Sequence, residues 1–339
     1  MAEQTNYERR EFLRKLGLVT AGLAVGGAGS RRLFAEQEGK VVVPKRKFGK
    51  HDLEVSSLAL GGHALRVASD KEAAKLVDAA LEMGVNFFDN AWDYHKGESE
   101  KLMGRLIEGR RDQVFLMTKV CTHDSADYDT AMRMLDESLE RLKTDHLDLW
   151  QWHAVATQEQ VKLGFEKGGV VEALTEAKRD GRVRYVGFTG HTNPDVHLAV
   201  LSEGYEFDAC QLPISPIEAN SNAFVRRVLP ELIKQNIAPL AMKTLGGNYA
   251  PVEKDVFSLN EGLDYALSHP IATLVTGTET AAQLRANARI AMNFSAMDPA
   301  KMVALEDRAK PAAESQNFEP YRRWMSYRDG DAHLYKGLA

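Results

Sequence analysis

Short apolar runs alternate with amphipathic segments along most of the chain, from about residue 47 to residue 295. The apolar runs predict strands of a parallel sheet, and the amphipathic segments predict the helices that connect them. The predicted strands are Ser56–Leu60, Asn86–Asn90, Val114–Lys119, Leu147–Trp152, Arg184–Phe188, Ala209–Leu212, Ala238–Met242 and Thr273–Thr276. The clearest predicted helices are Lys71–Met83, Glu98–Ile107, Thr130–Leu142, Val170–Arg179, Pro194–Leu201 and Ala223–Gln235.

Eight strand and helix units over roughly 250 residues are typical of an α/β fold of the (β/α)8 TIM-barrel type. A doubly wound sheet is the rival fold, but no GxGxxG motif follows an early strand. Residues Lys47–Val55, with a turn at Gly49–Asp52, predict a short hairpin that plugs the bottom of the barrel. We therefore expect one barrel domain over residues 47–295 and a C-terminal helical tail over residues 296–339 that packs on it. Whether the tail's aromatic residues reach the barrel mouth or stay outside is open.

The first 35 residues follow a different pattern. Arg9-Arg10 and Phe12-Leu13 precede a weakly apolar run, Leu16–Ala28, and small residues that suit a cleavage site. The run is shorter than the roughly 20 apolar residues of a membrane-spanning helix, so we expect no stable membrane anchor. The segment resembles a twin-arginine leader, which implies that the export machinery carries the folded protein to the periplasm. Residues 36–46 would then be a linker, and a disordered N-terminal arm is the alternative.

Composition excludes several classes of function. The 339 residues carry a formal net charge of -5 and no clustered basic segment, so nucleic-acid binding is not expected. The two cysteines, Cys121 and Cys210, are too few and too far apart for a zinc ribbon or an iron-sulfur cluster. Two free thiols are a simpler interpretation than a disulfide. We therefore expect no metal site and an organic redox cofactor.

Polar residues follow three neighbouring predicted strands at the end where barrel active sites lie. Asp89, Lys119 and His153 end or follow these strands, and Tyr94 comes five residues after Asp89. A buried lysine needs a carboxylate partner, and Asp89 is the natural one for Lys119. The ammonium group would stabilise the phenolate of Tyr94 and make this phenol a better proton donor. His153 could hydrogen-bond the oxygen of a carbonyl substrate.

Other functions fit some of these residues. Lys119 could form a Schiff base, as in a class I aldolase. The chain could also bind a nucleotide as a regulatory protein without turnover. An isolated lysine and aspartate pair is usually structural, so the interpretation depends on all four side chains meeting at the mouth.

The motifs Gly84–Ala91, Asp93-Tyr94 with Ser99-Glu100, Thr118-Lys119, Leu147–His153 and Gly181–Gly187 resemble the aldo-keto reductase family. The resemblance runs from Lys47 to about Asn293. It implies an NAD(P)H-dependent oxidoreductase that reduces an aldehyde or ketone, or oxidises the alcohol. It also implies that Tyr94 is the general acid, that Lys119 and Asp89 tune it, and that His153 positions the carbonyl.

The resemblance further implies a nicotinamide site and an adenosine-phosphate site. The residues in these places are Thr189, Gly190, Gln211, Met242 and Lys243 for the first, and Gly277, Thr278, Gln283 and Asn287 for the second. The family usually has Ser-Asn where this chain has Thr189-Gly190, and an aromatic residue near Met242. His191 could replace the missing amide. Arg285 and Arg289 favour NADP over NAD, and the mouth aromatics Trp92, Trp152, Tyr249, Tyr321 and Trp324 suit an apolar carbonyl compound or a sugar.

Overall fold

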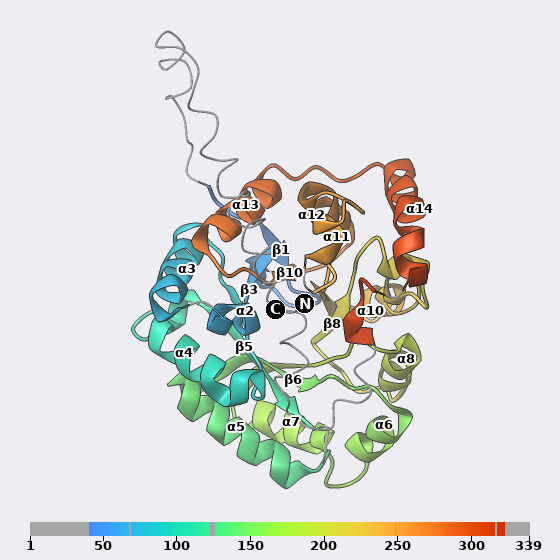
Figure 1. Cartoon of the computed structure of the whole chain (residues 1–339). Coiled ribbons are helices and arrows are strands. Elements are labelled where there is room, and N and C mark those ends of the chain that lie inside the picture. The colour runs from blue at the N-terminus through green and yellow to red at the C-terminus, as the bar shows by residue number, and fades with distance from the viewer. Residues whose placement is uncertain (1–40, 68, 123–125, 248, 316, 323–339) are drawn as a thin grey trace, which may run out of the picture.

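Eight parallel strands close into a barrel, and helices surround it (Figure 1). The computed structural model describes residues 41–322 except 68, 123–125, 248 and 316. The strand order is β10-β3-β4-β5-β6-β7-β8-β9. The strands are β3 (Leu58–Gly61), β4 (Phe87–Asp89), β5 (Phe115–Cys121), β6 (Leu147–His153), β7 (Val183–Thr189), β8 (Ala209–Pro213), β9 (Ala238–Met242) and β10 (Thr273–Thr276). The predicted (β/α)8 barrel is confirmed.

The helices follow the predicted order with additions and one correction. They are α2 (Gly62–Val67), α3 (Asp70–Glu82), α4 (Glu98–Ile107), α5 (Tyr128–Leu142), α6 (Gln158–Phe165), α7 (Val170–Arg179), α8 (Pro194–Ser202), α9 (Phe224–Arg227), α10 (Leu229–Lys234), α11 (Ala250–Glu253), α12 (Leu259–Ser268), α13 (Ala281–Met292) and α14 (Pro299–Ser315). The single helix predicted over Ala223–Gln235 is wrong, because it is divided at Val228 into α9 and α10. Pro230 has no N–H and disfavours helical backbone before it, so it suits the first turn of a new helix better than the interior of a long one.

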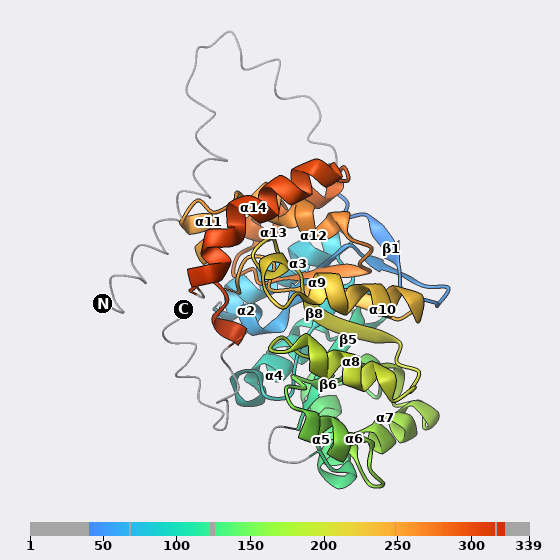
Figure 2. The same ribbon diagram turned by 90° about the vertical axis from the view of Figure 1, so that its right-hand side faces the viewer.

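A hairpin closes the N-terminal end of the barrel. Strands β1 (Lys45–Lys47) and β2 (Glu54–Ser56) pair antiparallel, as predicted. The fully buried ring of Phe48 lies 5.1 Å from the ring of Phe115, between their centroids, inside the barrel. Gly49 follows with a φ of +55°, and a Cβ there would lie 2.9 Å from the nitrogen of Ala238. In Figure 2 the hairpin lies at the opposite end of the barrel from α2, which leaves the C-terminal end for a site.

Side chains of each strand alternate between the barrel interior and the helical shell. On β5, Phe115 and Met117 belong to the interior cluster, whereas Leu116 and Val120 pack in the outer core with the helices. Lys119 and Cys121 continue the interior series. The chemistry-bearing residues at the strand ends therefore face one another across the mouth.

The C-terminal tail lies on the outside of the barrel and then reaches toward its mouth. Helix α14 buries Leu305, Ala309 and Ala312, and Tyr265 Oη donates a hydrogen bond of 2.6 Å to Glu306. Beyond it, Arg322 forms an ion pair of 3.2 Å with the buried Glu218, which follows β8.

The segment that resembles a leader, residues 36–40 of the predicted linker, and Trp324 of the tail lie outside the described residues. Within residues 41–322, apart from the gaps noted above, no helix has the length and apolar character needed to cross a membrane.

His197 on α8 is a fully buried titratable group in the outer core. Its ring centroid lies 5.1 Å from that of Phe188 and 4.9 Å from that of Phe224. Burial among these rings lowers the pKa of His197 from 6.5 to about 3. The native state therefore keeps this imidazole neutral where the unfolded chain would protonate it.

We expect this histidine to make the fold acid-sensitive. Because the unfolded state binds the extra proton, stability is complete above pH 6.5 and is lost as pH falls toward 3. The loss is about 1.4 kcal/mol per pH unit for one such group. In urea unfolding at neutral and acidic pH, the unfolding free energy of His197→Gln should depend less steeply on pH than that of the native chain. Equal slopes for His197→Gln and the native chain would contradict this account.

Candidate active site

The ammonium group of Lys119 is buried at the mouth with three oxygen acceptors around it. Lys119 Nζ donates to Asp89 Oδ1 at 2.8 Å, to the main-chain oxygen of Asn90 at 2.7 Å and to Tyr94 Oη at 3.4 Å. Lys119 and Asp89 are almost completely shielded from solvent. A buried charge pair is tolerated when its hydrogen bonds are complete, and this one approaches that condition.

The loop after β4 brings Tyr94 back over the end of β5. Its main chain pairs with that strand, because Asn90 N donates to Met117 O at 2.9 Å and Trp92 N donates to Lys119 O at 3.1 Å. A 3-10 turn, η1 (Tyr94–Gly97), follows, in which His95 and Lys96 have φ values of 51° and 58°. This left-handed backbone turns the chain sharply into α4. The phenol ring is therefore held 4.9 Å, centroid to Nζ, from Lys119.

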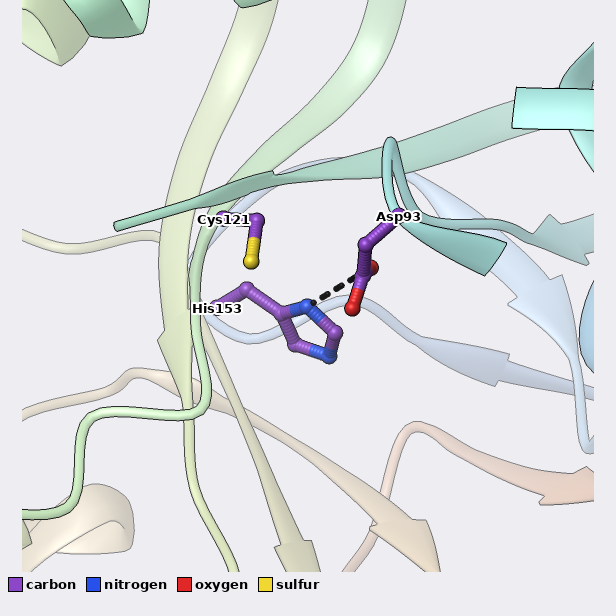
Figure 3. A group of neighbouring side chains, drawn as sticks. All are labelled: Asp93, Cys121 and His153. Carbon is purple, nitrogen blue, oxygen red and sulfur yellow. Dashed lines mark ion pairs between the residues drawn. The ribbon is translucent and has the colours of Figure 1, made fainter. Parts of the chain in front are cut away.

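His153 completes the group from the end of β6. Its ring lies edge-on to Tyr94, with 5.9 Å between the centroids. Figure 3 shows its Nδ1 turned toward Asp93, whose Oδ1 lies 3.3 Å away. On the other side of Tyr94, the ring of His63 from α2 lies edge-on at 5.3 Å. The structure thus brings together all four predicted catalytic residues.

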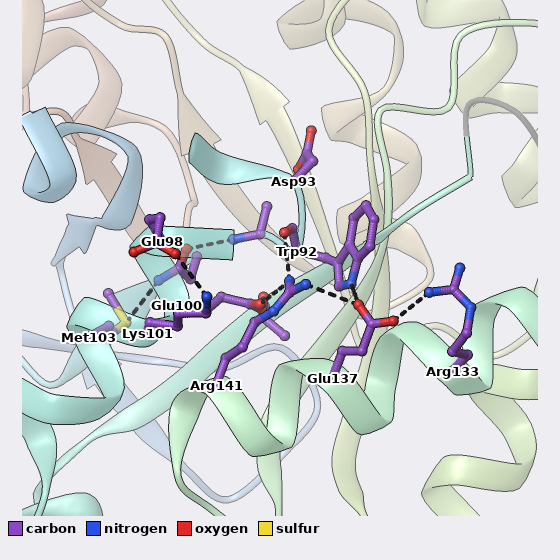
Figure 4. A network of polar contacts seen from close by, with 12 residues as sticks. Trp92, Asp93, Glu98, Glu100, Lys101, Met103, Arg133, Glu137 and Arg141 are labelled. Atoms are coloured by element: carbon purple, nitrogen blue, oxygen red, sulfur yellow. Dashed lines mark hydrogen bonds and ion pairs between the residues drawn. The ribbon is translucent and has the colours of Figure 1, made fainter. Parts of the chain in front are cut away.

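A charged network from the helical shell holds the loop that carries Tyr94 (Figure 4). Arg141 of α5 donates to the main-chain oxygen of Trp92 at 3.1 Å and to the buried Glu100 at 3.2 Å. Trp92 Nε1 donates to Glu137 at 2.8 Å, and Glu137 also pairs with Arg141 at 3.0 Å. Burial raises the pKa of Glu100, although Thr118 and Arg141 donate to its carboxylate. The position of Tyr94 therefore depends on side chains that are far from it in sequence.

Three of the residues predicted to hold the nicotinamide, Thr189, Gly190 and Gln211, lie on β7 and β8 and on the turn after β7. Gln211 Nε2 donates to Asp89 Oδ2 at 2.7 Å, so its amide joins the network of the ion pair. Thr189 is buried, and its main-chain oxygen accepts from Val155 N at 2.8 Å. A Cβ on Gly190 would lie 2.5 Å from the oxygen of Val155 and 2.6 Å from the ring of His197. This crowding explains why the chain has glycine where the family usually has asparagine.

The end of β9 places a sulfur and a second ammonium group at the mouth. Met242 is buried at the last position of the strand, and Lys243 follows with a φ of 60°. Lys243 Nζ lies 5.9 Å from the centroid of the tail residue Tyr321. Burial and the charge of Lys119 lower the pKa of Lys243 to about 8, so it still carries charge at neutral pH. Because Asp89 neutralises Lys119, it is Lys243 that adds a positive charge at the mouth, and this charge suits an anionic group.

The predicted adenosine-phosphate residues lie at the end of β10 and on α13. Tyr249 Oη donates to the oxygen of Gly277 at 3.0 Å. Gln283 accepts from the backbone of Glu279 and Thr280 in a capping box, so its oxygen serves the start of α13. Among the described residues, Thr278 Oγ1 and Asn287 Nδ2 are buried without a hydrogen-bond partner. Buried polar atoms of this kind fit a site that hydrogen-bonds a cofactor.

Several residues of the site were not predicted. Asp93 and Cys121 meet His153, and Arg141 reaches the loop from α5. The spacing of Cys121, two positions after Lys119 on one strand, was the available signal, because residues two apart share a face. The expectation that Trp152 lines the mouth is wrong. Its ring is buried against Phe165 of α6, and its Nε1 donates to Thr122 at 2.7 Å.

Several known proteins are similar to this chain in sequence. A profile described as the aldo/keto reductase family matches residues 57–255. The oxidoreductase YqkF of Bacillus subtilis, itself uncharacterized, is 27% identical over 304 residues, which are 78% of this chain and 96% of YqkF. The 6-dehydroglucose reductase of Novosphingobium aromaticivorans is 30% identical over 219 residues, 60% of this chain and 69% of that enzyme.

A solved structure has the same fold. The holo form of the aldo-keto reductase AKR11C1 from Bacillus halodurans superposes with a TM-score of 0.67 and 22% identity, covering 83% of this chain and 100% of that one. The profile match spans more than half of the chain and contains the Tyr94 loop and the Lys119 and His153 strands. This chain belongs to the aldo/keto reductase family, whose members are NAD(P)H-dependent oxidoreductases that reduce carbonyl groups.

Proposed function

We propose that the chain reduces a small aldehyde or ketone with Tyr94 as the general acid and NADPH as the hydride donor. The observation that carries this proposal is the contact of Tyr94 Oη with the buried, aspartate-paired ammonium group of Lys119 at 3.4 Å. A cation beside a phenol stabilises the phenolate, so this tyrosine can give up its proton at lower cost than a tyrosine in water.

Each neighbour of Tyr94 has a separate task in this proposal. Asp89 holds Lys119 in place, and Gln211 holds the second oxygen of Asp89. His153 orients the carbonyl oxygen toward Tyr94 and shares the negative charge that develops on it. Asp93 holds the Nδ1 side of the His153 ring, so the other ring nitrogen is presented to the mouth.

A bound nicotinamide cofactor supplies the hydride. The residues that would hold its ring are Thr189, Gly190, Gln211, Met242 and Lys243, and those for its adenosine end are Gly277, Thr278, Gln283 and Asn287. The unpartnered buried atoms of Thr278 and Asn287 support the second set. NADP is supported over NAD by the basic residues Arg285 and Arg289 of α13, of which Arg285 is paired with Glu82 at 2.8 Å. The NADP(+) in the name of a 27% identical relative from Schizosaccharomyces pombe also supports it.

The geometry of Lys119 argues against Schiff-base chemistry. A nucleophilic amine needs a free lone pair, whereas the three protons of this ammonium group are directed at Asp89, Asn90 and Tyr94. The complete set of four residues also argues against a nucleotide-binding regulatory protein without turnover.

We propose a small carbonyl compound, sugars included, as the substrate. The imidazole of His63 lies beside Tyr94 at the mouth and offers a polar group, while Met242 at the end of β9 offers an apolar one. A relative named for reduction of a 6-dehydroglucose supports a sugar.

Replacing Tyr94 tests the proposed acid directly. Tyr94→Phe keeps the ring and removes the proton, so carbonyl reduction should fall by about 100-fold or more. Nucleotide affinity, measured by titrating the protein fluorescence with NADPH, should stay unchanged. Tyr128→Phe, which alters a partly exposed tyrosine at the start of α5, should keep the native rate. Full activity of Tyr94→Phe, or loss of nucleotide binding with the activity, would refute the role.

Replacing Arg141 tests whether the network positions the Tyr94 loop. Arg141→Met leaves the carboxylate of Glu100 buried without its cation, and should cost about 3–5 kcal/mol of unfolding free energy as well as activity. Arg141→Lys keeps the charge but loses the forked geometry, so it should lose less of both. Urea unfolding and reductase rates measure the two effects. A fully stable and active Arg141→Met variant would show that the loop holds its place alone.

We also propose that the twin-arginine segment directs export of the folded protein to the periplasm. The segment Arg9–Leu13 with its short apolar run supports this proposal, as does the advantage of acquiring a nucleotide before export. Replacing Arg9 and Arg10 with lysine should retain the protein in the cytoplasm without altering its reductase rate. Fractionation of cells that express either form tests this, and equal periplasmic amounts would exclude the proposed route.

A further inference from the structure

Three potential metal ligands of different chemistry meet beside Tyr94. Cys121 is the last residue of β5 and His153 the last residue of β6, and the two are direct partners in the parallel pairing of these strands. Asp93 comes from the loop after β4. One ligand atom from each residue, Sγ, a ring nitrogen and a carboxylate oxygen, lies within 4.8 Å of the other two. Figure 3 shows the three side chains converging on one point.

This donor set matches the preferences of zinc. Thiolate, imidazole and carboxylate are its usual ligands, and three protein ligands with one open position are typical of zinc sites that exchange their fourth ligand. In a tetrahedral site with bonds of 2.0–2.3 Å, neighbouring ligand atoms lie roughly 3.3–3.8 Å apart. Asp93 Oδ1 and His153 Nδ1 are already 3.3 Å apart, so rotation of Cys121 toward them closes most of the remaining difference.

The three side chains lie at the solvent-facing end of the barrel. Asp93, Cys121 and His153 are each partly exposed, unlike the fully buried Cys210 of β8. The strand pairing holds the Cα atoms of Cys121 and His153 side by side, so the ligands are preorganised by the barrel. The thiol of Cys121, which is in no disulfide, is also the softest ligand at the mouth, and this favours zinc over magnesium or calcium.

We propose that Asp93, Cys121 and His153 bind one zinc-class divalent cation, with water in the fourth position. On binding, the thiol of Cys121 releases its proton to solvent and its sulfur bonds to the ion, while Nδ1 of His153 bonds to the ion with the ring proton carried on Nε2. The ion draws His153 toward Cys121 and away from Tyr94, so zinc inhibits carbonyl reduction. The inhibition rests on the role of His153 in the proposed function, whereas the binding does not.

Cobalt(II) tests the site without any activity measurement. The full chain, carrying no polyhistidine tag and freed of metal with a chelator, is titrated with Co²⁺ while absorption is recorded. One equivalent should produce thiolate-to-cobalt charge-transfer absorption, and Zn²⁺ should remove it. Cys121→Ser should abolish the band although Cys210 remains. Asp93→Asn should weaken binding by about tenfold or more, a loss typical of disturbed metal sites.

A second variant separates this site from other surface ligands. His146 pairs with Asp145 at 2.7 Å on the exposed surface, so His146→Asn removes a histidine and aspartate pair that lies elsewhere. It should keep the band and the affinity of the native chain. Absence of a thiolate band, or a band that survives in Cys121→Ser, would overturn the proposal and leave Cys121 as a packing residue.

Reductase rates with zinc test the predicted inhibition. For each variant, the rate with zinc is divided by the rate with chelator. This ratio should be at most about one tenth for the native chain and close to one for Cys121→Ser. If cobalt binds at the site but zinc does not inhibit the reductase, the proposal that the ion draws His153 away from Tyr94 is wrong. Absence of reductase activity in the metal-free native chain, together with the cobalt band, would instead count against the proposed function and support the metal site.

Discussion

The buried ion pair between Lys119 and Asp89 is the constraint on which the barrel mouth depends. Removing two charges from water costs several kcal/mol for each ion, and the cost is offset only where geometry and hydrogen bonding are nearly complete. Here β4, β5 and β8 supply the carboxylate, the ammonium group and the amide of Gln211. A shift of any of these strands would leave a charge without its partner. The closed barrel provides the required precision, because each strand is hydrogen-bonded on both sides.

Much of the fold and of the reactive group could be predicted from the sequence. Strands buried on both faces appear as apolar runs, and a lysine or histidine that ends such a run stands out against it. The pattern cannot tell which side of a doubly buried strand a residue faces. This is why Trp152 was assigned to the mouth although it packs under α6, and why Cys121 was considered only for cofactor clusters defined by cysteine spacing. Which side of the strand Cys121 and Trp152 face becomes clear only from the pairing of β5 with β6.

The least predictable parts are those made by contacts between distant segments. Arg141 holds the Tyr94 loop from the far end of α5, and nothing near Arg141 in sequence indicates this. The glycine at position 190 departs from the family pattern because His197, a residue of the following helix, occupies the neighbouring space. Such departures record packing peculiar to this chain.

The packing of Trp152 under α6 links the outer shell to the chemistry. A Cβ at Gly164 of that helix would lie 2.3 Å from the indole ring, so the ring and the helix fit without spare room. His153 is the next residue along the strand and points the other way, into the mouth. A change on the outside of the barrel that displaces the indole must therefore tilt the backbone that carries the imidazole. In this enzyme the helical surface is a second route by which mutation can adjust the reactive end of β6.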